Sequence, residues 1–148
     1  MLGTKKRDVT LSETAKRVID LARKVYDYYA VELPKRHPDY PLVHVDDEDT
    51  PPPPEERELK RLLASLPDDM IYQLLLIMNL GRGDFDTDDL ADSYEALRES
   101  SVRPEQAASQ MLGKASLADY LFDGLEELRK HKINVDKMRL TNVKVRKA

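Results

Sequence analysis

The most constraining feature of the sequence is a strongly apolar run at residues 68–81, in a chain in which 35% of the residues are charged. A helix that is apolar on most sides is a buried one. The run therefore predicts a core helix around which the rest of the chain packs. Its apolar side chains recur at helical spacing and cover most of the circumference: Met70, Ile71, Leu74, Leu75, Leu76, Ile77, Met78 and Leu80.

Local signals predict where this core helix begins and ends. Pro67 suits an early helical position, and Ser65 with Asp68 approximates a capping box. Gly81 suits the left-handed residue that ends a helix. In the turn that follows, Arg82 is expected to reach a carboxylate such as that of Asp84. The predicted structural turn consists of Gly81, Arg82, Gly83, Asp84 and Phe85.

Amphipathic segments on both sides of the core helix predict an all-α fold, a small bundle of about six helices. The first spans roughly residues 11–32, begins with a capping box of Thr10 and Glu13, and is expected to end before Pro34. Its stripe of Ala, Val and Tyr side chains predicts a half-buried face. A second helix, at residues 55–64, precedes the core helix. Three shorter helices follow it, with inward-facing residues that begin at Leu90, Ala107 and Leu117.

The chain divides into three predicted parts. These are an N-terminal helix with a Pro-rich and acid-rich linker (1–54), a helical core module (55–131) and a basic tail (132–148). The prolines and consecutive acids of residues 34–54 predict an extended, partly disordered connection. A weak apolar alternation at residues 140–145 is interpreted as tail, because a single strand has nothing to pair with.

Charge is distributed unevenly along the chain. Residues 129–148 carry eight Lys and Arg against one acid, Asp136, which gives a balance of +7. Since the whole chain carries −4, residues 1–128 carry −11. This asymmetry favours docking of the tail on the acidic body or on an acidic protein. Nucleic acid is the alternative ligand, but the tail has no aromatic residue for base stacking, so we expect weak binding that physiological salt abolishes.

The sequence lacks the residues and segments that several functions require. There is no Cys, which excludes disulfides and thiolate chemistry. No apolar run reaches the ~18 residues of a membrane span, and no signal-peptide segment follows Met1, so a cytoplasmic protein is expected. The three histidines, His37, His44 and His131, lie far apart and are expected on the surface. We predict no catalytic residue, no cofactor and no metal.

One acidic cluster keeps calcium binding open as an alternative. Five carboxylates fit positions 1, 3, 5, 9 and 12 of an EF-hand loop, but position 6, which should be glycine, is Asp89. The helical pattern that begins at Leu90 also argues against a loop there. Acids at a helix N-terminus explain the same residues without a metal. The five carboxylates are those of Asp84, Asp86, Asp88, Asp92 and Glu95.

Three blocks of sequence together resemble a known family. They are Leu66-Pro-Asp-Asp-Met70, Leu80-Gly-Arg-Gly-Asp-Phe85 and Tyr120-Leu-Phe-Asp-Gly-Leu125. They are similar to a mostly bacterial family of helical domains, domain of unknown function 3775, over about residues 59–128. The resemblance implies a helical fold and carries no activity, cofactor or catalytic residue with it.

These observations favour a non-catalytic helical module that binds a protein partner or forms a homodimer. The first helix is the expected contact surface, because its long Tyr, Ala and Val stripe exceeds what a short module covers, and Tyr is enriched at interfaces. Two alternatives remain open at this point. One is an accessory nucleic-acid binder that acts through the basic tail. The other is an enzyme or calcium-binding protein that uses the carboxylates between Asp84 and Glu95.

Overall fold

The structure is a computed structural model that describes residues 9–138 and 140 of the 148-residue chain. The described residues form six α-helices, two short 3₁₀ helices and no strand, which confirms the all-α prediction. None of the described helices has the length and apolar character that a membrane crossing requires. In order, the elements are α1 (Leu11–Arg36), α2 (Pro54–Ser65), α3 (Asp68–Arg82), η1 (Thr87–Asp89), α4 (Leu90–Glu99), α5 (Pro104–Leu112), α6 (Leu117–Lys130) and η2 (Val135–Lys137).

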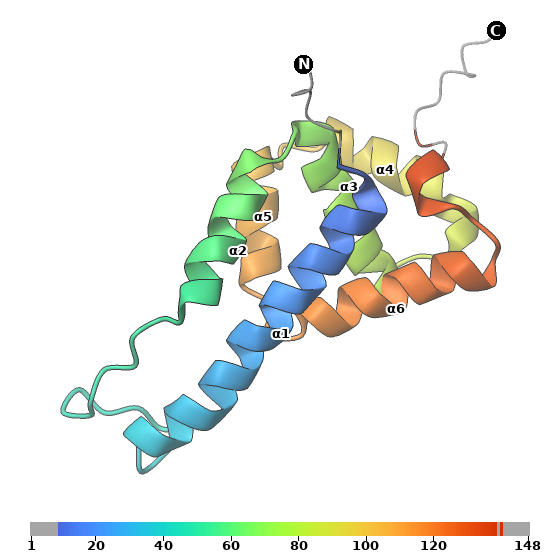
Figure 1. Cartoon of the computed structure of the whole chain (residues 1–148). Helices are drawn as coiled ribbons and strands as arrows, with labels where there is room; N and C mark the ends of the chain where they lie inside the picture. Colours follow the sequence, from blue (N-terminus) through green and yellow to red (C-terminus); the bar gives the residue numbers. More distant parts are fainter. Residues whose placement is uncertain (1–8, 139, 141–148) are drawn as a thin grey trace, which may run out of the picture.

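Helix α3 is the core helix that the apolar run predicts, and it extends one residue further than expected, to Arg82. Its closest neighbour is α6, and it also contacts α5, α4 and α1. Figure 1 shows α3 enclosed by the other helices. One core cluster unites residues of α1, α2 and α3 with residues of α4, α5 and α6. The buried residues of α3 are Ile71, Tyr72, Leu74, Leu75, Leu76, Ile77, Met78 and Leu80.

Helices α3 and α6 touch backbone to backbone at two glycines. A Cβ placed on Gly81 would lie 1.8 Å from the carbonyl oxygen of Tyr120, and one on Gly124 would lie 2.1 Å from the carbonyl oxygen of Ile77. Neither position has room for any side chain. The two glycines therefore allow α6 to lie directly on the central helix.

The prediction that Gly81 ends the core helix is wrong. Gly83 ends it instead, with a left-handed φ of 86°. The N–H of Gly83 donates to the carbonyl of Leu80, and the N–H of Asp84 donates to that of Asn79, which is a Schellman motif. A Cβ on Gly83 would meet nothing within 4 Å, so this glycine serves the turn and Gly81 serves the helix contact.

Two other predicted helix boundaries need correction. Pro34 does not stop α1, which continues to Arg36. Pro34 has no N–H to donate to the carbonyl of Ala30, four residues earlier in the helix. The loss of this hydrogen bond costs little free energy, because it falls in the last part of α1 and Ala30 is exposed. Ser65 does not cap α3, because its hydroxyl donates back to the carbonyl of Leu62 in α2, and Pro67 is the N-cap residue.

The described part of the predicted basic tail packs on the bundle. After α6 the chain turns through η2, and the carboxylate of Asp136 accepts hydrogen bonds from the backbone N–H and the hydroxyl of Ser12, at 2.8 and 2.7 Å. Leu140 is buried. The first turn of α1 is thus held by Asp136 as well as by its own capping box of Thr10 and Glu13. The remainder of the apolar alternation at 140–145 lies outside the described residues.

The glycine contact predicts a large and specific effect on stability. Gly81→Ala or Gly124→Ala should lower the free energy of unfolding by about 3 kcal/mol or more, because α3 and α6 must separate to admit the methyl group. Gly113→Ala is the matched control. Gly113 is exposed at the end of α5 with φ −79°, and we expect its change to stay within about 1 kcal/mol. Urea unfolding measures all three, and a Gly81→Ala protein as stable as wild type would contradict the backbone contact.

Candidate protein-binding surface

The predicted structural turn joins α3 to α4 and lies against α6. Arg82 Nε lies 3.8 Å from Asp84 Oδ2, and the Arg82 guanidinium lies 5.8 Å from the centre of the Tyr120 ring. Gly83 makes the left-handed turn, and Phe85 is partly buried against the core. The five turn residues therefore position α4 relative to α6.

The carboxylates of the calcium alternative do not lie on one loop. Asp86 precedes η1, Asp88 lies within it, and Asp92 and Glu95 lie on α4. In residues 9–138 and 140, no group of three His, Asp or Glu side chains is arranged to hold a metal ion. The turn and α6 border a hollow of about 670 Å³ that is rich in acids, among them Asp86, Asp88, Asp123 and Glu127.

Helix α1 is longer than the bundle on which it packs. Its buried residues all lie between Leu11 and Ala22, and from Val25 onward its side chains are partly or fully exposed. Figure 1 shows this second half of α1 and the following loop projecting away from the other helices. We refer to residues 25–53 as the arm.

The loop of the arm is organised around a buried histidine, so the prediction that His37 is a surface residue is wrong. His37 is 6% exposed, and its Nδ1 lies 3.0 Å from Asp47 Oδ2. Its Nε2 lies 3.1 Å from the hydroxyl of Thr50. The backbone N–H of His44 donates to the same Asp47 oxygen at 2.9 Å. The linker is therefore a compact set of turns rather than the extended connection expected from its composition. His44 and His131 are exposed.

Tyr28 and Arg36 hold this loop to α1, and Tyr29 joins α1 to α2 at the base of the loop. The hydroxyl of Tyr28 donates to the carbonyl of Pro51 at 2.5 Å, and that of Tyr29 donates to Glu56 Oε1 at 2.6 Å. Burial, together with the Glu56 carboxylate, raises the pKa of Tyr29 to about 12. Arg36 bonds Glu32 in its own helix and Glu48 in the loop.

Exposed apolar side chains are concentrated in the arm. The arm also carries seven acidic and two basic residues, a balance of −5. Exposed apolar surface of this kind marks interaction sites on soluble proteins. In the described part of the chain, the large apolar side chains exposed outside the arm are Val9 and Phe122. Those exposed within it are Tyr26, Val31, Tyr40, Leu42, Val43 and Val45, the last at 98%.

The inner side of the arm borders a groove of about 630 Å³. Val25, Tyr29 and Leu33 line it from α1, Leu112 lines it from the end of α5, and Lys114 lines it from the connection between α5 and α6. The groove exists because the apolar stripe of α1 continues past the end of the bundle. The expected half-buried face of this helix is thus present in its second half, whereas its first half is in the core.

The fold and the arm define a small helical protein with an ordered, apolar and acidic projection. The model of the family described as "Protein of unknown function (DUF3775)" matches residues 56–129, and the chain belongs to this family. No curated protein and no solved structure gives a match. The family segment begins near the start of α2 and ends near the end of α6, so the arm lies outside it.

The hydrogen bonds to the Asp47 carboxylate predict that acid destabilises the loop. The backbone N–H of His44 and then the His37 side chain hold the pKa of Asp47 below its ordinary value. The stabilisation is therefore complete above the unfolded pKa of ~3.9 and is lost as the pH falls through the lower folded value. We expect the amide protection factors of His44 and Asp47 to be constant from neutral pH to about 4 and to fall below it.

Hydrogen exchange followed by NMR measures these protection factors, with the amides of α3 as an internal reference. In Asp47→Ala, protection in the loop should be low at every pH. An unchanged loop profile in this variant would contradict the role of the carboxylate.

Proposed function

We propose that this protein is a non-catalytic module that binds a protein molecule through the arm. The observation that carries the proposal is the set of exposed apolar side chains on a loop already ordered by internal hydrogen bonds. A loop that is ordered before binding loses little conformational entropy on association, so more of the contact energy appears as affinity.

The charge of the arm indicates the chemistry of its partner. A surface of balance −5 repels the phosphate backbone of a nucleic acid and attracts a basic surface. Apolar side chains such as Leu42 and Val45 require an apolar recess in which to be buried. The arm therefore suits a protein with an apolar recess and cations at its rim. The alternative of nucleic-acid binding through the basic tail stays a prediction, because residues 141–148 lie outside the described residues.

The arm is a narrower contact surface than the whole first helix that the sequence suggests. Deletion of the first helix, as residues 1–33, is therefore unsuitable as a test of binding. It would also remove the buried residues between Leu11 and Ala22 and so disrupt the core. Substitutions confined to the arm tip avoid this problem, because Leu42 is 64% and Val45 is 98% exposed.

Site-specific photocrosslinking tests the proposed function. A photoreactive residue in place of Val45, in cells that produce the full chain, should yield protein adducts of discrete mass. The same residue in place of Ala96, which is exposed on α4, is the control and should yield none. Adducts at Val45 should disappear when Leu42→Asp is added. Equal adducts at both positions, or none at Val45, would refute the arm as a protein-binding surface.

A further inference from the structure

A third hollow lies between the first half of α1 and the second half of α6. Its volume is about 560 Å³, within the range of ~300–1,000 Å³ typical of ligand clefts. Phe122, which is 44% exposed, forms part of its wall, and we call it the Phe122 hollow. The other apolar residues that line it are Ile19, Leu125, Leu128, Ile133 and Val135.

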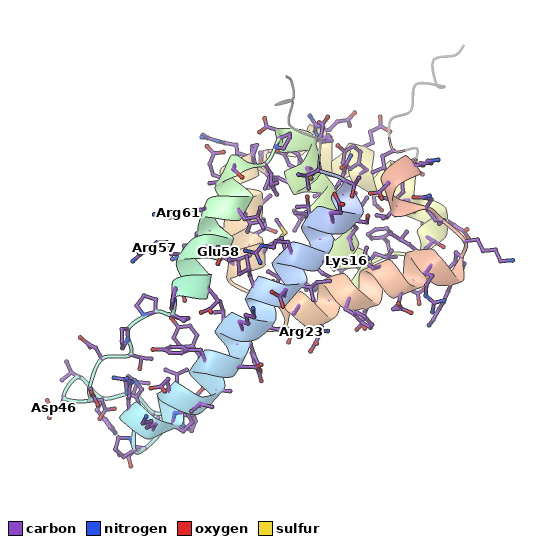
Figure 2. The ribbon with its side chains drawn as sticks, in the orientation of Figure 1. Lys16, Arg23, Asp46, Arg57, Glu58 and Arg61 are labelled. Carbon is purple, nitrogen blue, oxygen red and sulfur yellow. The ribbon has the colours of Figure 1, made fainter. Side chains whose placement is uncertain are left out.

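Two cations of the Phe122 hollow have no carboxylate partner among the described residues. Lys16 lies on α1 and forms no ion pair there, and the Arg23 guanidinium lies 5.6 Å from the centre of the Phe122 ring. Figure 2 shows both residues on α1, far from the arm tip. Arg129, which also lines the hollow, is already paired with Glu126. The two carboxylates of the lining, Asp20 and Glu126, are paired with Lys24 and Arg129. The hollow thus combines an apolar wall with two cations, Lys16 and Arg23, that form no ion pair in the described residues.

The arm tip carries the complementary features. Leu42, Val43 and Val45 are exposed there. The carboxylates of Asp46 and Asp49 make no hydrogen bond or ion pair in the described residues, whereas Asp47 is engaged within the loop. Figure 2 shows Asp46 at the outermost point of the arm. The two free carboxylates and three apolar side chains of the arm tip are therefore complementary to the two cations and the apolar wall of the Phe122 hollow.

These two surfaces cannot meet within one chain. From Asp20 at the hollow to Arg36 at the base of the loop, α1 is one continuous helix, and its sixteen residue steps at ~1.5 Å each span about 24 Å. The loop then continues away from the bundle, as Figure 1 shows. Contact between the surfaces requires a second molecule.

Two larger hollows fit the arm tip less well. The hollow beside the structural turn is lined by Asp86, Asp88 and Asp123, which would repel an acidic loop. The groove under the arm is partly built by the arm itself, through Tyr40 and Leu33. Charge and apolar character therefore favour the Phe122 hollow over these two.

We propose that the arm binds a second copy of this chain, and that two copies pair reciprocally, each placing its arm tip in the Phe122 hollow of the other. The proposal rests on the proposed function and specifies its partner. A reciprocal pair uses the same two surfaces twice around a two-fold axis and leaves neither exposed, so assembly stops at the dimer.

Sedimentation equilibrium of the purified full chain is the first test. We expect a monomer–dimer equilibrium with a Kd of about 1–10 µM, the weak end of the range for protein interfaces. Leu42→Asp/Val45→Asp and, separately, Lys16→Glu/Arg23→Glu should each weaken the dimer at least about tenfold. Arg57→Glu/Arg61→Glu is the matched control. Both arginines are exposed on α2 and lie outside the hollow. This double substitution changes the net charge by the same amount as Lys16→Glu/Arg23→Glu, and it should leave the dimer Kd within about twofold.

Mixing the two weakened variants gives the sharper result. The arm of Lys16→Glu/Arg23→Glu and the hollow of Leu42→Asp/Val45→Asp are both intact, so the mixed pair keeps one of the two contacts, whereas each variant alone keeps neither. The mixture should therefore form a 1:1 complex that is tighter than the dimer of either variant and weaker than that of the wild type. Unchanged far-UV circular dichroism and melting temperature show that both variants are folded. A mixture that associates no more tightly than either variant alone, or a wild-type chain that is monomeric at about 100 µM, overturns the proposal. If the arm then still crosslinks to a different protein in cells, the proposed function stands and only the identity of its partner is wrong.

Discussion

The backbone contact between α3 and α6 determines where the rest of the molecule lies. Gly81 and Gly124 allow the two helices to approach until each glycine faces a carbonyl oxygen of the other helix. The position of α6 then places the turn that follows it against the start of α1, where Asp136 binds Ser12. Because α1 is fixed at its first turn and buried only as far as Ala22, its second half extends past the bundle. The arm is thus the part of α1, with the loop that follows it, that continues beyond these contacts.

The arm differs from the bundle in how it is stabilised. The bundle is held by one continuous apolar core. The loop of the arm is held by polar contacts, with His37 at its centre, Asp47 as the shared acceptor and the tyrosine hydroxyls at its base. This leaves its apolar side chains facing outward. A loop built in this way presents Leu42, Val43 and Val45 in one arrangement, which suits recognition of a partner. The arm lies outside the segment that matches the family.

The helices could be predicted from the sequence because helical periodicity is a local signal. The core helix was predicted to within one residue at its C-terminus, since eight of its side chains are buried and the pattern is dense. The role of Gly81 could not be read in the same way. A helix end and a close helix crossing both select glycine, and Gly81-Arg82-Gly83 offers two candidates for one left-handed position. Only the position of α6 distinguishes them.

The contacts that organise the arm were missed for a related reason. His37 meets Asp47 ten residues later, and no helical or strand period relates such positions. The proline and acid content of residues 34–54 is typical of a disordered linker. In the sequence Asp136 is one acid in a basic tail, whereas in the structure it holds the start of α1 from 124 residues away. Pairings of this range depend on the completed fold.

The central claim is that the arm tip and the Phe122 hollow are two halves of one contact between molecules. Deuterium uptake of the full chain, compared below and above the dimer Kd, tests it most directly because it locates the contact on the sequence. The account predicts slower exchange at the higher concentration in peptides covering residues 40–49 and 119–129, with no change in those covering α2 (Pro54–Ser65). Uptake that is independent of concentration in the arm and in α6 would contradict it.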